Sequence, residues 1–292
     1  MGKNHLSLFI FAVSTFISFS VFSQTILISD VDDTLKSSHV LNKPDALRNT
    51  VQLRNHFYGM GELYTAIQET KPEIIFFYLS AAPEALMEKL HMAFLTKNGF
   101  PGGELILRHT LSDKDFKIKT IRSIIEKHQP QKVILVGDNG ERDPYIYEQA
   151  RSEYPHIQFD IYIHQVYSYR ARKEIGVPQQ SGHTLFITAI DLARALVQNH
   201  DLSEEELNQL ALDTIPVFFK QDPKKELGPL FIPSWVDCRD FFKLENLKPT
   251  SWNLDPRWAS ETQRSAAEWL MAYDQKLSAR CQNGPTVKSK VK

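Results

Sequence analysis

Short apolar runs alternate with segments of helical periodicity between Thr25 and Val166. The apolar runs lie at residues 25–29, 73–80, 104–109, 132–138 and 159–166. Apolar side chains recur with helical spacing at residues 61–70, 84–97, 115–128 and 144–154. Strands that alternate with helices in this way predict an α/β fold, in which a doubly wound parallel sheet is covered by helices on both faces.

The pattern changes after Arg170. Residues 174–182 have the composition of a linker, and residues 183–200 and 259–281 show helical periodicity. Ser203 and Glu206 stand at the spacing of a capping box. These features predict a mainly helical C-terminal region at 171–282, followed by a polar, flexible tail at 283–292.

The first 23 residues differ from the rest of the chain. Lys3 precedes an apolar run of about 17 residues, and Ser23 ends a stretch with the small residues that a signal peptidase reads. A membrane anchor is the alternative, but the run contains five Ser or Thr residues and falls short of the ~20 apolar residues of a spanning helix. We therefore expect residues 1–23 to be a cleaved signal peptide and the protein to be periplasmic or secreted.

Composition and charge narrow the range of partners. A chain with 42% hydrophobic and 24% charged residues is typical of a soluble globular protein. Without Lys3 the 34 basic residues become 33, which against 35 acidic residues gives a net charge of −2. This balance does not favour nucleic acid as a partner, and no protein partner is evident.

Because export implies an oxidising compartment, we expect Cys238 and Cys281 to form a disulfide rather than remain free thiols.

Acidic side chains follow two of the predicted strands. Asp30 ends the first strand and Asp32 lies two residues further, so both side chains can point to the same side while Asp33 turns away. Asp138 stands at the end of the apolar run at 132–138. Two carboxylates about 4 Å apart repel by roughly 4 kcal/mol at an effective dielectric constant of ~20, so a cation must neutralise them. Carboxylates from two strand ends, together with waters and a phosphate, suit Mg²⁺.

Three further segments contain candidate site residues. Ser80 ends the predicted strand at 73–80, and a hydroxyl near a helix N-terminus suits a phosphate. Helical periodicity places Lys117 at the edge of the apolar face of residues 115–128, which favours Lys117 over Lys114 and Lys119 as the cation. Glu141 and Asp143 follow Asp138 and could support the site. Asp143 precedes Pro144, so a helix N-cap is an equally weighted role for it.

The order of these residues resembles the haloacid dehalogenase superfamily of phosphotransferases. Over about residues 26–166 the chain is similar to the catalytic domain of the actin-patch-associated phosphatidate phosphatases. The segments that carry this resemblance are SDVDDTLKSS, GMGELY, FYLSAAPEAL, GFPGGELILRH, FKIKTI and GDNGERDPYIY. The resemblance implies a haloacid dehalogenase-like catalytic domain at residues 24–170, with a Rossmann-like sheet.

The family pattern assigns a role to each matching position. It makes Asp30 the nucleophile and Asp32 the general acid and base, and Thr34, Ser80 and Lys117 would position or bind the phosphoryl group. Asp138 would bind Mg²⁺ together with Asp30 and the main-chain carbonyl of Asp32. Two positions depart from the pattern: His164 stands where the family has Arg, and Glu84 stands where it has Trp.

The resemblance implies an exported, Mg²⁺-dependent phosphatidate-type phosphatase that forms an aspartyl-phosphate. Its substrate would be a phosphomonoester, in particular a lipid phosphate at a membrane or micelle surface. About 40 residues separate Thr34 from the second strand and about 35 separate Ser80 from Lys117, which leaves no room for a large cap domain. A phosphatase of soluble phosphomonoesters or phosphoproteins is one alternative function. A non-catalytic phosphate- or lipid-binding module is the second.

Overall fold

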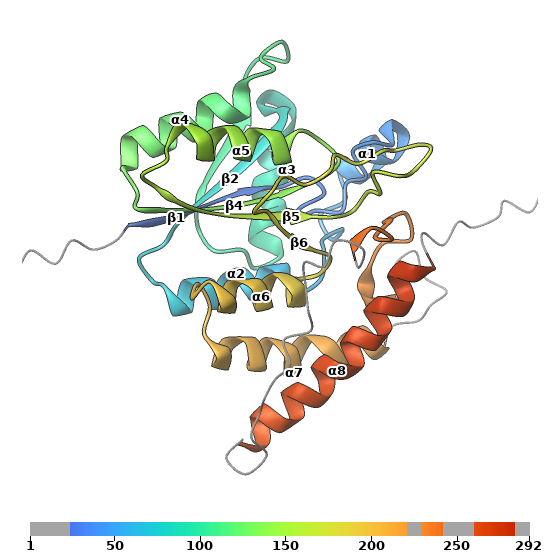
Figure 1. Ribbon diagram of the computed structural model, residues 1–292. Coiled ribbons are helices and arrows are strands. Elements are labelled where there is room, and N and C mark those ends of the chain that lie inside the picture. The colour runs from blue at the N-terminus through green and yellow to red at the C-terminus, as the bar shows by residue number, and fades with distance from the viewer. Residues whose placement is uncertain (1–23, 221–228, 242–259, 284–292) are drawn as a thin grey trace, which may run out of the picture.

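The centre of the molecule is a six-stranded sheet with the order β3-β2-β1-β4-β5-β6, in which every neighbouring pair is parallel (Figure 1). The strands are β1 (Thr25–Asp30), β2 (Ile75–Pro83), β3 (Glu104–Arg108), β4 (Lys132–Asp138), β5 (Gln158–His164) and β6 (Thr184–Phe186). The computed structural model describes residues 24–220, 229–241 and 260–283. The predicted signal peptide at 1–23 and nearly all of the predicted tail at 283–292 lie outside these residues.

Helices cover both faces of the sheet, as predicted for a doubly wound fold. They are α1 (Lys43–Thr50), α2 (Met60–Thr70), α3 (Glu84–Lys97), α4 (Phe116–His128), α5 (Asp143–Glu153), α6 (Ala189–Gln198), α7 (Glu204–Lys220) and α8 (Glu261–Gln282), with a short 3-10 helix, η1 (Pro229–Phe231). In Figure 1, α4 and α5 lie together on one face, and α2 and α6 lie on the other, with α7 and α8 beyond them. Within the described ranges, no helix combines the length and the apolar character needed to cross a membrane.

The order of the strands reverses between β1 and β4. The chain moves from β1 outward to β2 and β3, then returns to β4 on the other side of β1. Every residue of β1 and β4 is buried, which agrees with their continuous apolar sequences. Connections that leave in opposite directions open a crevice beyond the carboxyl ends of the two strands, and ligands of doubly wound proteins bind there. The fold therefore places Asp30 and Asp138 at this crevice.

The C-terminal region differs from the prediction in one respect. Residues 183–200 were predicted as helical throughout, but Thr184–Phe186 form β6, which pairs with β5 and extends the sheet. Helix α6 begins only at Ala189, because the side chain of Thr188 accepts a hydrogen bond from the main chain and Asp191 completes a capping box. Outside the C-terminal region, helix α1 was not predicted either. The predicted helix at 259–281 is present as α8, which packs against α7.

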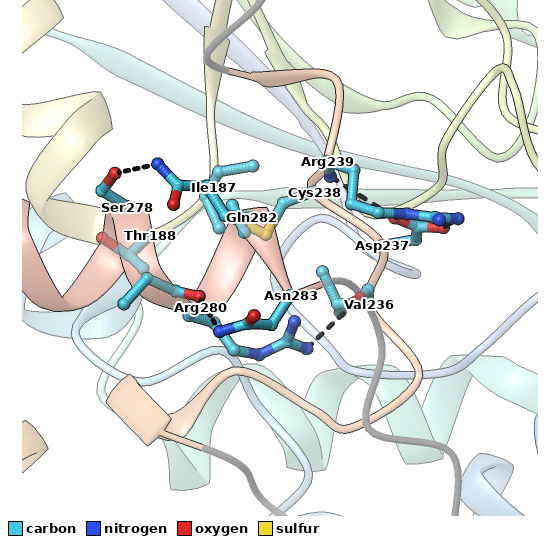
Figure 2. The surroundings of a disulfide bond; sticks show 12 residues. Ile187, Thr188, Val236, Asp237, Cys238, Arg239, Ser278, Arg280, Gln282 and Asn283 are labelled. Carbon is cyan, nitrogen blue, oxygen red and sulfur yellow. Dashed lines mark hydrogen bonds and ion pairs between the residues drawn. A yellow bond between two sulfur atoms is a disulfide. The ribbon is translucent and has the colours of Figure 1, made fainter.

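A disulfide joins the end of α8 to the segment that follows η1. Figure 2 shows the surroundings of this bond, in which Arg280 donates a hydrogen bond to the carbonyl of Val236. The bond connects Cys238 and Cys281, with a Cα–Cα distance of 4.9 Å, and both residues are buried. The predicted pairing of the two cysteines is therefore confirmed.

Replacing both cysteines by alanine is expected to lower the free energy of unfolding by about 2–4 kcal/mol, since the bond closes a loop with a sequence separation of 43. None of the predicted site residues lies in the segments that the bond joins, so any activity of the folded variant should stay near that of the wild type. Urea denaturation of both proteins, with activity measured below the unfolding transition, tests both statements. An unchanged unfolding free energy would show that the bond does not stabilise the native state.

Candidate active site

The structure brings most of the predicted site residues together at the carboxyl ends of β1 and β4. Asp30 is the last residue of β1 and Asp138 the last residue of β4, and both are buried. Lys117 reaches them from the first turn of α4. Thr34, in the loop after β1, donates a hydrogen bond of 3.0 Å to Oδ2 of Asp30.

Lys117 is the cation of this cluster. Its Nζ lies 2.7 Å from Oδ1 of Asp30 and 2.6 Å from Oδ1 of Asp143, and the side chain is buried. Burial alone lowers the pKa of the Lys117 ammonium, but the charges of Asp143, Asp30 and Glu141 outweigh burial and raise it. Lys119, in contrast, is exposed and pairs with Asp113. The choice of Lys117 from the helical pattern therefore agrees with the structure.

Asp143 has a different position from the helix N-cap that was one prediction for it. Arg142 occupies the N-cap position of α5, and no side-chain hydrogen bond caps that helix. The Asp143 carboxylate instead contacts Lys117, and it lies so close to β4 that a Cβ on Gly137 would be 2.5 Å from its Oδ2. Gly137 thus makes room for Asp143 inside the crevice. Glu141 is more distant, with Oε2 3.8 Å from Nζ of Lys117.

Asp30, Asp138 and Asp143 form a group that could hold a metal ion. One oxygen from each carboxylate lies within 4.8 Å of the others, and all three residues are buried. Burial, reinforced by the neighbouring carboxylates, raises the pKa of Asp30 and of Asp138. Three carboxylates and one ammonium have a formal charge of −2, which a divalent cation would balance. Because all the donors are hard oxygens, the group fits Mg²⁺.

The carboxylate of Asp32 lies among a different set of partners. Ser38 donates to Oδ1 at 2.6 Å, and Ser80 and His91 both contact Oδ2 at 3.0 Å. Burial by itself raises the pKa of Asp32, but the hydrogen bond and charge of His91, together with Ser38 and Lys36, hold it below its ordinary value. The side chain of Asp32 is therefore not part of the three-carboxylate group. A metal contact through its main-chain carbonyl stays a prediction.

His91 was not identified from the sequence. It lies on α3 and is fully buried, on the same side as Met87, Phe94 and Leu95. A single histidine among the apolar positions of an amphipathic helix is a weak signal, because such residues are often ordinary core residues. Only the contact between α3 and the loop after β1 shows that His91 Nε2 reaches Asp32.

Ser80 differs from its prediction in local structure. It does not end its strand, because β2 continues to Pro83 with a register shift in the pairing with β3. Pro83 occupies the N-cap of α3 rather than its first turn. The Ser80 hydroxyl donates to Asp32 and accepts a hydrogen bond of 3.1 Å from the amide of Ala82. Ser80 therefore lies beside the Asp32 carboxylate in the crevice, and a phosphate contact stays a prediction.

Asp33 organises the loop that connects β1 to α1. It has a φ of 59°, in the left-handed region. Its charge contributes to the raised pKa of Asp138, so the prediction that Asp33 turns away from the site carboxylates stays a prediction. Its carboxylate accepts hydrogen bonds from the Tyr167 hydroxyl and from three consecutive main-chain amides, those of Ser38, His39 and Val40. These bonds fix the loop that carries Thr34.

The two positions that depart from the family pattern have structural contacts. His164 is buried, and its two ring nitrogens lie 2.9 Å from the carbonyl oxygens of Asp33 and Ile187. Its ring stacks on Phe186. Glu84 begins α3 and forms an ion pair with His109. His164 thus joins β5 to the loop after β1 and to the segment after β6.

His164 is expected to make the protein less stable in acid. Burial lowers its pKa from the ordinary 6.5 to about 4. Between these values the unfolded state binds more protons than the native state, so the free energy of unfolding falls as the pH falls from about 6.5 to 4. The full effect is roughly 3 kcal/mol.

A His164→Gln variant should lose this contribution, so that its free energy of unfolding depends less on pH than that of the wild type. The exposed His156 provides the matched control, His156→Gln. Urea denaturation at several pH values between 7 and 4 measures both. Parallel profiles for wild type and His164→Gln would contradict the assignment, because all other titrating groups are common to the two proteins.

Comparisons with known proteins agree with this geometry. Residues 25–165 match the family described as "Phosphatidate phosphatase APP1, catalytic domain". The phosphatidate phosphatase APP1 of Saccharomyces cerevisiae is 28% identical over 150 residues, which cover 47% of this chain and 25% of that protein. An uncharacterized protein of Schizosaccharomyces pombe is 25% identical over 158 residues, covering 49% of this chain and 25% of that protein. The matched regions span about a quarter of the length of these relatives.

The matched residues begin at the first residue of β1 and end just after β5. They include every predicted site residue, from Asp30 to Asp143. The resemblance to actin-patch-associated phosphatases is thus supported for this segment. Together the family match and the yeast relative support an APP1-like phosphatase catalytic domain at residues 25–165.

Proposed function

We propose that this protein is an exported, Mg²⁺-dependent phosphatidate-type phosphatase of the haloacid dehalogenase superfamily. The observation that supports this most is the environment of Asp30. One of its oxygens contacts the buried Lys117, the other accepts a hydrogen bond from Thr34, and two further carboxylates lie beside it. A carboxylate that is oriented at both oxygens, next to a cation and a potential metal site, is suited to nucleophilic attack on phosphorus.

The proposed reaction has two displacements. In the first, an oxygen of Asp30 attacks phosphorus, the bond from phosphorus to the ester oxygen breaks, and the protonated Asp32 gives its proton to the leaving oxygen. In the second, Asp32 accepts a proton from water while the water oxygen attacks phosphorus. The bond between phosphorus and Asp30 then breaks, which releases inorganic phosphate and restores the Asp30 carboxylate and the protonated Asp32.

Asp32 must hold a proton when the substrate is bound. In the absence of substrate its neighbours, above all His91, keep its pKa below the ordinary value. A phosphoryl group brings negative charge into the crevice, and a nearby negative charge raises the pKa of a carboxyl group. Substrate binding therefore favours the protonated form that the first displacement requires.

Asp30, Asp138 and Asp143 are the residues that would hold Mg²⁺, which supplies electrostatic stabilisation to the phosphoryl oxygens when bound. Lys117 provides a second positive charge next to Asp30. With Mg²⁺ bound, the two cations would together offset the burial of three neighbouring carboxylates. Without a cation, the mutual repulsion of the carboxylates and the cost of burial favour protonation, which would remove the nucleophile.

A phosphomonoester panel tests the function. Initial rates are measured for phosphatidate in mixed micelles, glycerol phosphate, a nucleotide monophosphate and a phosphopeptide, each with Mg²⁺ and with EDTA. We expect the highest kcat/KM for phosphatidate and no turnover in EDTA. Equal or higher rates for the soluble esters would favour the soluble-phosphomonoester or phosphoprotein phosphatase. Inertness toward every ester, together with binding of phosphate or lipid, would favour the non-catalytic module.

Asp32→Asn is expected to lower kcat by about 10²–10⁴-fold, the range typical of a general acid and base. The loss should be smaller for phenyl phosphates with electron-withdrawing groups, since a leaving group of low pKa needs less protonation. A series of substituted phenyl phosphates measures this dependence. A loss that is independent of the leaving group would contradict the role as proton donor.

Export is supported by the sequence of residues 1–23 alone. If it occurs, N-terminal sequencing of protein purified from outside the cytoplasm should find Gln24, or a residue near it, as the first residue. An intact N-terminus that begins at Met1 and fractionates with membrane would instead indicate an anchor.

A further inference from the structure

Exposed apolar side chains gather in the segments that follow the strands. Each of the first five strands is followed by a segment with an exposed large apolar or aromatic side chain, and their exposed fractions lie between 47 and 77%. These residues are Leu47 after β1, Leu86 after β2, Leu111 after β3, Tyr145 after β4 and Ile175 after β5. We call these five residues the apolar rim.

The apolar rim lies at the same edge of the sheet as the active site. Because the strands are parallel, their carboxyl ends share one edge, where Asp30 and Asp138 are located. Ile175 is held at this edge, since the next residue, Gly176, donates to the carbonyl of Ser168, and Val177 donates to that of Asn139, directly after β4.

The opposite edge of the sheet has a different surface. The segments that lead into β2, β3, β4 and β5, at 71–74, 98–103, 129–131 and 154–157, contain none of the exposed large apolar side chains found in the described residues. Val51 at the end of α1, Met92 in the second half of α3 and Met271 on α8 are also exposed and lie outside these segments. Five of the eight exposed large apolar residues in the described part of the chain thus belong to the apolar rim.

Basic residues accompany the apolar rim. Every rim residue has an exposed Lys or Arg within three positions in the sequence. The exposed basic residues of these segments are Lys43, Arg48, Arg54, Lys89, Lys114, Arg142, Arg170, Arg172 and Lys173, and the exposed acidic residues are Glu88, Asp115 and Glu141. The acidic residues Asp45, Glu84, Asp113 and Glu174 of the same segments are half-buried. Among the fully exposed charged side chains at this edge, positive charges therefore outnumber negative ones, although the mature chain as a whole is slightly acidic.

We propose that the apolar rim and its basic neighbours dock on an anionic lipid surface, so that the phosphate pocket faces lipid phosphates. This inference rests on the proposed function, because it identifies the part of the protein that would meet the lipid surface carrying the substrate. Single apolar side chains separated by basic residues suit a bilayer interface, where the apolar groups enter the headgroup region and the basic groups meet lipid phosphates. A folded partner that covered all five rim residues would also cover the crevice between them.

Vesicle binding of the full mature chain tests the proposal without turnover. The probes are vesicles of phosphatidylcholine with and without phosphatidylserine, a phosphodiester that the proposed reaction does not hydrolyse. The rim variant combines Leu47→Ser, Leu86→Ser and Ile175→Ser, and Met271→Ser is the matched control on α8. We expect the rim variant to bind phosphatidylserine vesicles about tenfold or more weakly than wild type, and the control to bind as wild type.

A charge variant, Arg172→Gln with Lys173→Gln, should bind phosphatidylserine vesicles about tenfold or more weakly and leave binding to pure phosphatidylcholine unchanged. Para-nitrophenyl phosphate hydrolysis should be equal in all variants, because none of these residues belongs to the site. If every ester is inert while the rim-dependent vesicle binding persists, the proposed function fails and the docking surface stands.

Two results would overturn the docking surface. One is equal vesicle binding by wild type and the rim variant, or an equal loss in Met271→Ser. The other is the absence of vesicle binding by wild type. In that second case, sedimentation velocity distinguishes a further occupant. If the wild type forms a dimer and the rim variant does not, a second copy of the chain covers this surface.

Discussion

Asp30→Asn is expected to abolish phosphate release while the protein stays folded. The amide cannot act as the attacking carboxylate, so kcat should fall on the order of 10⁴-fold or more. The fold should tolerate the change because the side chains are nearly isosteric, and Lys117 keeps its contact with Asp143. Removing one of three neighbouring carboxylates also relieves repulsion, since burial and the neighbouring charges of Asp143 and Asp32 raise the pKa of Asp30.

The measurement is initial phosphate release from phosphatidate and from para-nitrophenyl phosphate, alongside circular dichroism and thermal unfolding. Asp213→Asn, an exposed position on α7, is the matched control and should keep wild-type activity. Rapid acid quench should trap an acyl phosphate in wild type and none in Asp30→Asn. Near-normal turnover by Asp30→Asn would rule out covalent catalysis through this residue.

Lys117→Gln is expected to affect both stability and activity strongly. The change leaves the carboxylates of Asp30 and Asp143 buried without their cation, and breaking a buried ion pair in this way costs about 3–5 kcal/mol of unfolding free energy. Activity should fall as well, because the phosphoryl group loses one of its two cations. Urea denaturation in EDTA isolates the effect on stability from any effect of metal.

The stability difference between wild type and Lys117→Gln should shrink as the pH falls. Burial raises the pKa of Asp30 and Asp138, so acid protonates these carboxyls in the native state and removes the repulsion that Lys117 offsets. Lys119→Gln provides a control from the same helix, and its exposed ion pair should contribute little to stability because solvent screens it. A Lys117→Gln variant as stable as Lys119→Gln would show that the ammonium does not hold the carboxylates together.

The helical and strand patterns of the sequence predicted most of the catalytic half of the fold. The predicted strand at 132–138 and helix at 84–97 coincide with β4 and α3. Such patterns are reliable here because the central strands are buried on both faces and the helices on one, which imposes a clear arrangement of apolar residues. Lys117 could be chosen over Lys119 because the fixed angle between successive helical residues places Lys117 nearer the apolar face of its helix.

Elements whose stability depends on distant partners were harder to predict. β6 has only three residues and exists through its pairing with β5, and α1 has little apolar character to mark it. The role of Asp143 depends on the loop after β4, which delivers its carboxylate to Lys117 rather than to the end of α5. His91 lies 59 positions after Asp32 in the sequence, so only tertiary packing brings the two side chains together.

The sequence by itself determined which residues stand at the strand ends and which face of each helix is apolar. It therefore predicted that Asp30 and Asp138 would lie at one edge of a parallel sheet, and it selected Lys117 as the candidate cation. Those conclusions follow from periodicities within single elements. Only the tertiary structure decided that Asp143 joins Asp30 and Asp138, that the Asp32 carboxylate lies with Ser80 and His91, and that exposed apolar side chains surround the crevice. Distances between side chains on separate elements depend on how the loops turn and how the elements pack, and no local pattern specifies them.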